Sequence, residues 1–166
     1  MLITEYYRKQ NVQLHRDRVT YGSRERLARY GEISNLLLSG ESILDYGCGK
    51  ASMSRHLERV TNYDPALYPE LPEPHDLVVC MDVLEHIEPD CLNDVLQHIA
   101  SLTKRLAYLV ISNAKHGKTL PDGRYSHLIV KPAHWWLKRL CTVFGSVQYV
   151  QVAADENNDM TFICRP

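Results

Sequence analysis

The chain has 166 residues, of which 45% are hydrophobic and 23% are charged, and its formal net charge is −1. These values are ordinary for a soluble globular protein, and the length suits one domain with a continuous core. No apolar run approaches the length of a membrane span, and the first residues become polar too soon for a signal peptide, so we expect a cytoplasmic protein.

The cysteines predict neither a disulfide framework nor a metal centre. They are odd in number and show no paired spacing typical of zinc ligands, so reduced thiols explain them best. They are Cys48, Cys80, Cys91, Cys141 and Cys164. We therefore expect no metal site.

Basic residues gather in two segments. Residues 1–31 carry seven Lys or Arg against three acids, and residues 104–139 carry eight against Asp122 alone. If both segments face a ligand, they favour an anionic substrate such as a nucleotide, a sugar phosphate or a nucleic acid. A solvated surface explains the same charges equally well, and both interpretations stay open.

The amino-terminal part predicts one clear helix. Residues 1–22 mix aromatic and charged residues without a clean period, so no boundary is assigned within them. Ser23 is suited to cap a helix that Gly40 ends. The apolar residues at helical spacing between them are Leu27, Tyr30, Ile33, Leu37 and Leu38.

Alternating strands and helices are expected next. A strand over residues 42–46 leads through a glycine-containing turn into a helix over about 52–59 and a strand over 60–63. Four prolines between Asp64 and Asp76 forbid a long helix there and make a central strand improbable.

The second half continues the alternation. The pattern predicts a buried strand over residues 76–81, an amphipathic helix over 90–102 and a strand over 105–111. After a long loop, Pro132 is suited to start a helix that runs to about residue 144. The final strands, 147–153 and 160–164, flank a turn at residues 156–159.

The glycine-containing turn is the most informative motif. In ILDYGCGKAS, residues 43–52, an apolar strand runs into Asp45 and is followed by Gly47 and Gly49. Asp64 ends the next apolar segment, and its distance from Asp45 suits one strand, helix and strand. Both acids would then lie at the carboxyl edge of neighbouring parallel strands, where open α/β sheets bind ligands.

Read together with DLVVCMDVLEHI, residues 76–87, this motif resembles the class I S-adenosylmethionine-dependent methyltransferases, whose glycine loop usually reads acid-x-Gly-x-Gly-x-Gly. Ala51 stands at the third glycine position. The resemblance implies a three-layer α/β sandwich with a mostly parallel, Rossmann-like sheet and a C-terminal antiparallel hairpin. It implies S-adenosyl-L-methionine as cofactor and a methyltransferase activity. Most members also insert a helix and a strand in the region where this chain has its prolines.

Two other functions fit parts of the same motif. A non-catalytic S-adenosylmethionine-binding partner protein could keep Asp45 and Asp64 without acceptor chemistry. A small nucleotide-binding oxidoreductase also needs glycines after a strand, but its fingerprint requires glycine at Ser52. An acid before the first glycine also suits a positively charged sulfonium amino acid better than an anionic pyrophosphate.

The resemblance also implies residue roles. Asp64 would bind the ribose hydroxyls, and Asp45 would order the glycine loop and face the methionine amino group. Asp82 would lie near the transferred methyl group, as both a cofactor contact and a catalytic residue. The cofactor-binding residues expected on this basis are Asp45, Gly47, Cys48, Gly49, Asp64, Pro65 and Asp82.

The acceptor side is assigned from position. The loop over residues 115–134 follows the fifth expected strand, and His127 within it is a candidate catalytic base. Its cations Lys115, Lys118, Arg124 and Lys131 favour an anionic acceptor, either a small molecule or a nucleic acid. For His86 a structural role in a helix turn is favoured over catalysis. Residues 1–40 are expected to form a helical lid or cap, and residues 41–166 the cofactor-binding core of a single domain.

Overall fold

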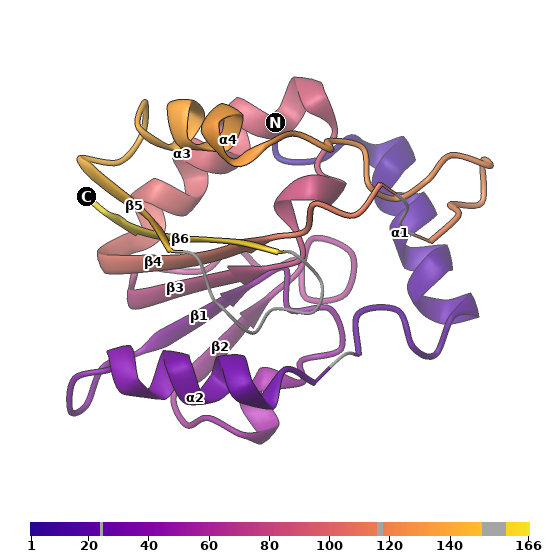
Figure 1. Cartoon of the computed structure of the whole chain (residues 1–166). Coiled ribbons are helices and arrows are strands. Elements are labelled where there is room, and N and C mark those ends of the chain that lie inside the picture. Colours follow the sequence, from indigo (N-terminus) through magenta and orange to yellow (C-terminus); the bar gives the residue numbers. More distant parts are fainter. Residues whose placement is uncertain (24, 116–117, 151–158) are drawn as a thin grey trace.

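The computed structural model describes residues 1–23, 25–115, 118–150 and 159–166 (Figure 1). One six-stranded sheet has the order β2-β1-β3-β4-β6-β5. Its strands are β1 (Ile43–Tyr46), β2 (Val60–Tyr63), β3 (His75–Met81), β4 (Thr103–Ile111), β5 (Ser146–Val150) and β6 (Met160–Arg165). The α-helices are α1 (Glu5–Asp17), α2 (Leu27–Leu36), α3 (Leu92–Leu102) and α4 (Ala133–Leu140). No helix in the described ranges is both long and apolar enough to cross a membrane.

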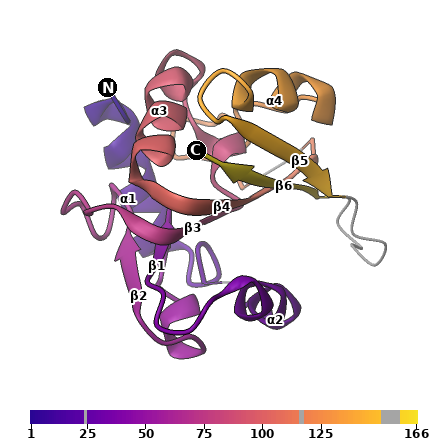
Figure 2. The same cartoon turned by 90° about the vertical axis from the view of Figure 1, so that its left-hand side faces the viewer.

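Helices cover both faces of the sheet. Figure 2 shows α3 and α4 on one face and α2 on the other. Strand β3 explains this arrangement, because Val78 and Cys80 pack into the core under α3 and α4, whereas Leu77 and Val79 belong to the core under α2. Alternate side chains of a strand point to opposite faces, so a strand that is apolar on both must be covered twice.

The predicted fold class is confirmed. Strands β2, β1, β3 and β4 pair in parallel, and β6 pairs antiparallel with both β4 and β5. Tyr46 pairs with Tyr63 at the carboxyl ends of β1 and β2, which brings Asp45 and Asp64 to the same edge. Residues 151–153 of the last predicted hairpin, and 156–158 of its turn, lie outside the described residues.

The proline-rich segment behaves as expected. Between β2 and β3 the chain forms no strand or helix, only an isolated bridge between Asp64 and Tyr68. Strand β2 is therefore the edge of the sheet. A short irregular connection thus stands where the resemblance implies an inserted helix and strand.

The helix expected over residues 52–59 is not formed. Its only helical part is the 3₁₀ helix η1 (Met53–Arg55). Ala51 and Arg59 have φ values of 55° and 58°, and these left-handed residues enclose a segment too short for a stable α-helix.

Two helix boundaries also differ from expectation. The N-cap of α2 is Arg26 instead of Ser23, and Leu38 lies beyond the end of the helix with 63% of its surface exposed. Helix α4 stops at Leu140, before the expected residue 144. Apolar residues at helical spacing therefore predict the right helices but extend their ends, because apolar side chains also occur in the adjoining turns, where Leu38 is exposed and Phe144 is buried.

Helix α1 was not assigned from the sequence. Its buried face consists of Tyr7, Asn11, Leu14 and His15, which recur at helical spacing, but two of these four are polar. Thr4 caps the helix by accepting a hydrogen bond from the Tyr7 amide. In Figure 1 the helix lies beside the sheet, across the end where the parallel strands finish.

The left-handed conformation of Ala51 generates a stability prediction. A residue with a side chain pays about 1–2 kcal/mol for a left-handed backbone conformation, whereas glycine does not. Glycine also has greater freedom in the unfolded chain, which offsets part of this gain. Ala51→Gly should therefore raise the free energy of unfolding by roughly 0.5–1 kcal/mol in urea titrations. Ala100→Gly, inside α3, should lower it by about 1 kcal/mol. A loss at both positions would contradict the prediction.

Candidate active site

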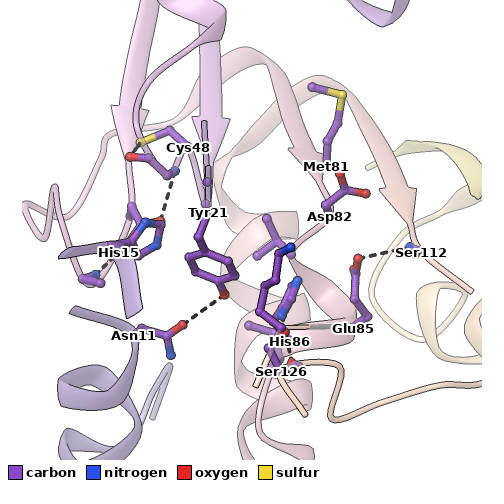
Figure 3. A pocket seen from close by; sticks show the side chains of 18 of the residues that line it. Asn11, His15, Tyr21, Cys48, Met81, Asp82, Glu85, His86, Ser112 and Ser126 are labelled. Atoms are coloured by element: carbon purple, nitrogen blue, oxygen red, sulfur yellow. Dashed lines mark hydrogen bonds between the residues drawn. The ribbon is translucent and has the colours of Figure 1, made fainter. Parts of the chain in front are cut away.

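A cavity of about 490 Å³ opens at the carboxyl edge of the parallel strands. Figure 3 shows His15 and Cys48 on one side of it, and Asp82, Glu85 and His86 on the other. All the expected cofactor-binding and catalytic residues line this cavity: Asp45, Gly47, Cys48, Gly49, Asp64, Pro65, Asp82 and His127.

Asp64 joins the glycine loop to the turn after β2. One carboxylate oxygen accepts a hydrogen bond of 3.1 Å from the Gly49 amide, and the other accepts one of 2.8 Å from the Ala66 amide. The second oxygen also accepts from the Leu67 amide at 3.3 Å. Each carboxylate oxygen has two lone pairs, so the oxygen bonded to Gly49 keeps capacity for a ligand donor. Asp64 is thus both a turn-forming residue and a cavity-lining acceptor.

Asp45 is a buried acid without a hydrogen-bond partner among the described residues. Burial, followed by the nearby charge of Asp64, raises the pKa of Asp45 to about 7. No basic side chain in the described ranges forms an ion pair with either acid. A positively charged ligand group in the cavity would favour the ionised form of Asp45.

The two glycines of the loop are required by the fold itself. A Cβ at Gly47, whose φ is 77°, would lie 2.8 Å from Val83 Cγ1, and one at Gly49, whose φ is 51°, would lie 2.6 Å from the carbonyl oxygen of Gly22. From the sequence we attributed them to close approach of a ligand. The structure adds packing against Val83 and Gly22 as a second reason. Cys48, between them, is buried, and burial raises the pKa of its thiol, so its main chain is the part suited to contact a ligand.

The segment after α1 is attached to the glycine loop. The Lys50 amide donates to the Gly22 carbonyl at 2.7 Å, and the Lys50 ammonium donates to the Arg18 and Val19 carbonyls at 3.1 and 2.8 Å. These hydrogen bonds fix the chain beyond α1 to the loop that carries Gly49.

Helix α1 supplies cavity residues that the sequence did not indicate. Tyr7, Asn11 and His15 line the cavity from its buried face, and Tyr21 follows them. The only available signal was the helical spacing of these residues, in which polar side chains occupied expected core positions.

Asp82 is held by an arginine that was also missed. The Arg26 guanidinium forms ion pairs with Asp82 and, at 3.0 Å, with Asp159. Burial opposes the charge of Arg26, but the two carboxylates outweigh it and leave its pKa raised. Asp82 also has a φ of 56°, an uncommon conformation for a residue with a side chain. Arg26 thus connects the start of α2, the end of β3 and the residue that precedes β6.

His86 and His127 lie together on the side of the cavity opposite Cys48 and His15. Their ring centroids are 4.8 Å apart. Burial, followed by the proximity of His127, lowers the pKa of His86 to about 3, so His86 is neutral at physiological pH.

The predicted cationic loop contributes less charge than expected. Of its four cations only Lys118 lines the cavity. Arg124 forms an ion pair of 2.7 Å with Asp122, and Lys131 lies over the Trp135 ring, 6.0 Å from its centroid. Local partners therefore hold Arg124 and Lys131, and Lys115 is exposed. The placement of these three cations beside an acceptor stays a prediction.

The chain matches a known protein family over most of its length. A family model described as a methyltransferase domain matches residues 15–154. The chain belongs to this methyltransferase family. Its fold is that of the class I S-adenosylmethionine-dependent members, as the sequence motif predicted, and the match leaves the oxidoreductase alternative without support. Among curated proteins no sequence match was found.

Solved structures share the fold at low sequence identity. The 1,6-didemethyltoxoflavin-N1-methyltransferase of Burkholderia thailandensis, solved with S-adenosylhomocysteine, has a TM-score of 0.66 and 17% identity over 96% of this chain and 86% of its own. The DhpI–SAH complex has a TM-score of 0.65 and 16% identity over 96% of both chains. A chain of the Pnkp1/Rnl/Hen1 RNA repair complex has a TM-score of 0.58 and 15% identity over 84% of this chain and 41% of its own.

Because the pKa of Asp45 is raised, the free energy of unfolding of the ligand-free methyltransferase should depend on pH. The carboxyl has a pKa of about 7 in the folded protein, against an ordinary value of 3.8. The free-energy cost of burying the ionised carboxylate is therefore absent below about pH 4, grows as pH rises and is complete above pH 7. About three pKa units correspond to about 4 kcal/mol as an upper value. Asp45→Asn should therefore raise the free energy of unfolding at pH 8 and have little effect at pH 4.

Chemical denaturation at the two pH values measures this difference. The control is Glu58→Gln, which removes an exposed carboxylate and should change stability little at either pH. An Asp45→Asn protein that is no more stable than the wild type at pH 8 would be inconsistent with a strained, unpaired carboxylate.

Proposed function

We propose that this methyltransferase binds S-adenosylmethionine between the glycine loop and Asp64, and transfers the methyl group to a compact acceptor on the side of Asp82 and His127. The observation that carries the proposal is the pair of buried carboxylates, Asp45 and Asp64, at the ends of adjacent parallel strands. The sulfonium cofactor supplies an activated methyl group whose leaving group is a neutral thioether.

The residues on the cofactor side fit this ligand. Asp45, which has no hydrogen-bond partner among the described residues, would accept hydrogen bonds from the methionine ammonium. The free position on the Asp64 oxygen bonded to Gly49 would accept a ribose hydroxyl. Pro65 and Ala66 line the cavity and offer apolar surface to the adenine. The volume of about 490 Å³ lies within the range of small-molecule sites.

The residues on the acceptor side are suited mainly to positioning. Asp82 is paired with Arg26, and an adjacent positive charge makes a carboxylate a weaker base. We infer that Asp82 orients the acceptor beside the methyl group, and that His127 assists acceptors that must lose a proton. A good neutral nucleophile needs only orientation here.

The acceptor is a small molecule or a single exposed group of a nucleic acid. The solved relatives include an enzyme bound to 1,6-didemethyltoxoflavin and a chain of an RNA repair complex, which represent both classes. Of the four cations in the loop over residues 115–134, Lys118 lines the cavity and supports a preference for an anionic acceptor. Incubation with cofactor labelled at the methyl group and fractionated cell extract tests the proposal, because label enters metabolites or RNA. Cofactor binding without any labelled product would favour the non-catalytic alternative.

Cofactor affinity should depend on Asp64 more than on Asp82. Asp64→Asn can keep the turn through its carboxamide oxygen, but it loses the acceptor of the Gly49 amide and the charged acceptor of the ribose. The charged acceptor alone is worth about 1.5–3 kcal/mol, or roughly tenfold to more than a hundredfold in affinity. Asp82→Asn should act mainly on turnover. Calorimetric titration of both variants with S-adenosylmethionine makes the comparison. An equal or greater loss for the Asp82 variant would refute the assigned roles.

The pKa of Asp45 predicts how cofactor affinity changes with pH. If the ammonium group binds the ionised carboxylate, affinity should fall about tenfold for each pH unit below 7 and level off between pH 7 and 8. Asp45→Asn should bind weakly without this slope. Methylthioadenosine, which lacks the amino acid part, serves as the matched ligand and should show no such dependence. The same slope in Asp45→Asn would assign the titration to another group.

A further inference from the structure

Three potential metal ligands meet on the acceptor side of the cavity. Glu85 and His86 belong to the 3₁₀ helix η2 (Leu84–His86), and His127 lies in the loop after β4. One ligand atom from each residue lies within 4.8 Å of the other two. The backbone holds the two segments together, since the Leu128 and Ile129 amides both donate to the Glu85 carbonyl, at 2.8 and 2.9 Å. Backbone hydrogen bonds therefore hold the three side chains close together.

Each histidine is oriented by a backbone carbonyl. His86 Nδ1 lies 2.8 Å from the Ser126 carbonyl oxygen, and His127 Nδ1 lies 2.9 Å from that of Ala114. A carbonyl only accepts hydrogen bonds, so Nδ1 carries the proton in both rings and Nε2 keeps its lone pair. This arrangement, with one nitrogen anchored and the other available, is the one that metal-binding histidines adopt.

Glu85 lacks a partner that its burial requires. The side chain is fully buried, with 0% of its surface exposed. Its Oε1 accepts from the Ser112 amide at 3.3 Å, whereas Oε2 has no hydrogen-bond partner although it is inaccessible to solvent. Figure 3 shows the Glu85 carboxylate beside the cavity, with its bond to Ser112. Such an oxygen costs free energy unless a donor or a cation satisfies it.

We propose that Glu85, His86 and His127 bind one divalent first-row transition-metal ion. One carboxylate and two imidazoles suit Mn²⁺, Fe²⁺, Co²⁺ or Zn²⁺, whereas Mg²⁺ and Ca²⁺ prefer oxygen ligands alone. With bonds of about 2.1 Å, neighbouring ligand atoms in an octahedral site are about 3 Å apart, so the side chains close by an ångström or two around the ion. From the sequence we expected no metal site, because the cysteines lack the spacing of zinc ligands. The proposed site contains no cysteine.

The site also bears on the acceptor. Three protein ligands leave coordination positions that face the cavity, and such positions take oxygen atoms from water or from a bound molecule. This step rests on the proposed methyl transfer. It narrows the acceptor class to compounds that present a hydroxyl or carboxylate oxygen near His127.

Metal titration of the whole chain tests the site without cofactor or acceptor. After treatment with a chelator and its removal, Mn²⁺ is added at pH 7.5 and bound ion is measured by electron paramagnetic resonance and calorimetry. We expect one ion per chain. Glu85→Gln and His127→Gln should each weaken binding at least tenfold. His134→Gln, an exposed histidine on α4, should leave binding unchanged.

Two further measurements distinguish a loss of metal binding from a loss of folding or of cofactor binding. Circular dichroism and thermal unfolding establish that each variant is folded, and the half-buried His127→Gln carries the test if Glu85→Gln does not fold. Absence of saturable Mn²⁺ binding, or binding that both variants retain, would overturn the proposal. S-adenosylmethionine is titrated in parallel without metal. Retained cofactor binding with no metal binding defeats only the metal site, whereas metal binding with no cofactor binding defeats only the proposed function.

Discussion

Two neighbouring carboxylates that form no ion pair with a basic side chain of the described residues dominate the organisation of this protein. Parallel pairing of β1 and β2 forces Asp45 and Asp64 to the same edge of the sheet, where both are buried. Amides of the glycine loop and of the following turn stabilise Asp64, while no described residue does the same for Asp45. Polar residues of α1 cover this edge. The sheet thus creates a region of negative potential that remains unbalanced until a cation enters the cavity.

The opposite side of the cavity is organised by a different electrostatic principle. There Arg26 forms ion pairs with both Asp82 and Asp159, and the neutral His86 lies against His127. One end of the cavity therefore attracts a positively charged ligand, whereas the other pairs its carboxylates with Arg26 and offers nitrogen and oxygen lone pairs. A single cavity with two such ends is well suited to keep a cofactor and an acceptor in a fixed orientation.

The sequence predicted features that depend on local pattern and missed those that depend on tertiary contacts. Strands β1, β2 and β3 and helix α3 follow from apolar periodicity, and the acids and glycines from one motif. Helix α1 was missed because Asn11 and His15 occupy its buried face. Arg26 gave no local signal, since its partners are 56 and 133 positions away along the chain. The grouping of Glu85 with His127 likewise depends on backbone hydrogen bonds between distant segments.

Helix α1 links the two ends of the cavity mechanically. At its start, Thr4 donates to Glu88 at 2.8 Å and the Tyr7 hydroxyl donates to the His86 carbonyl at 2.7 Å. Beyond its end, the chain is bound to Lys50 in the glycine loop. Thirteen helical residues form a rod of about 20 Å that does not compress. A displacement of the glycine loop is therefore transmitted to the residues around His86, unless one of these hydrogen bonds breaks first.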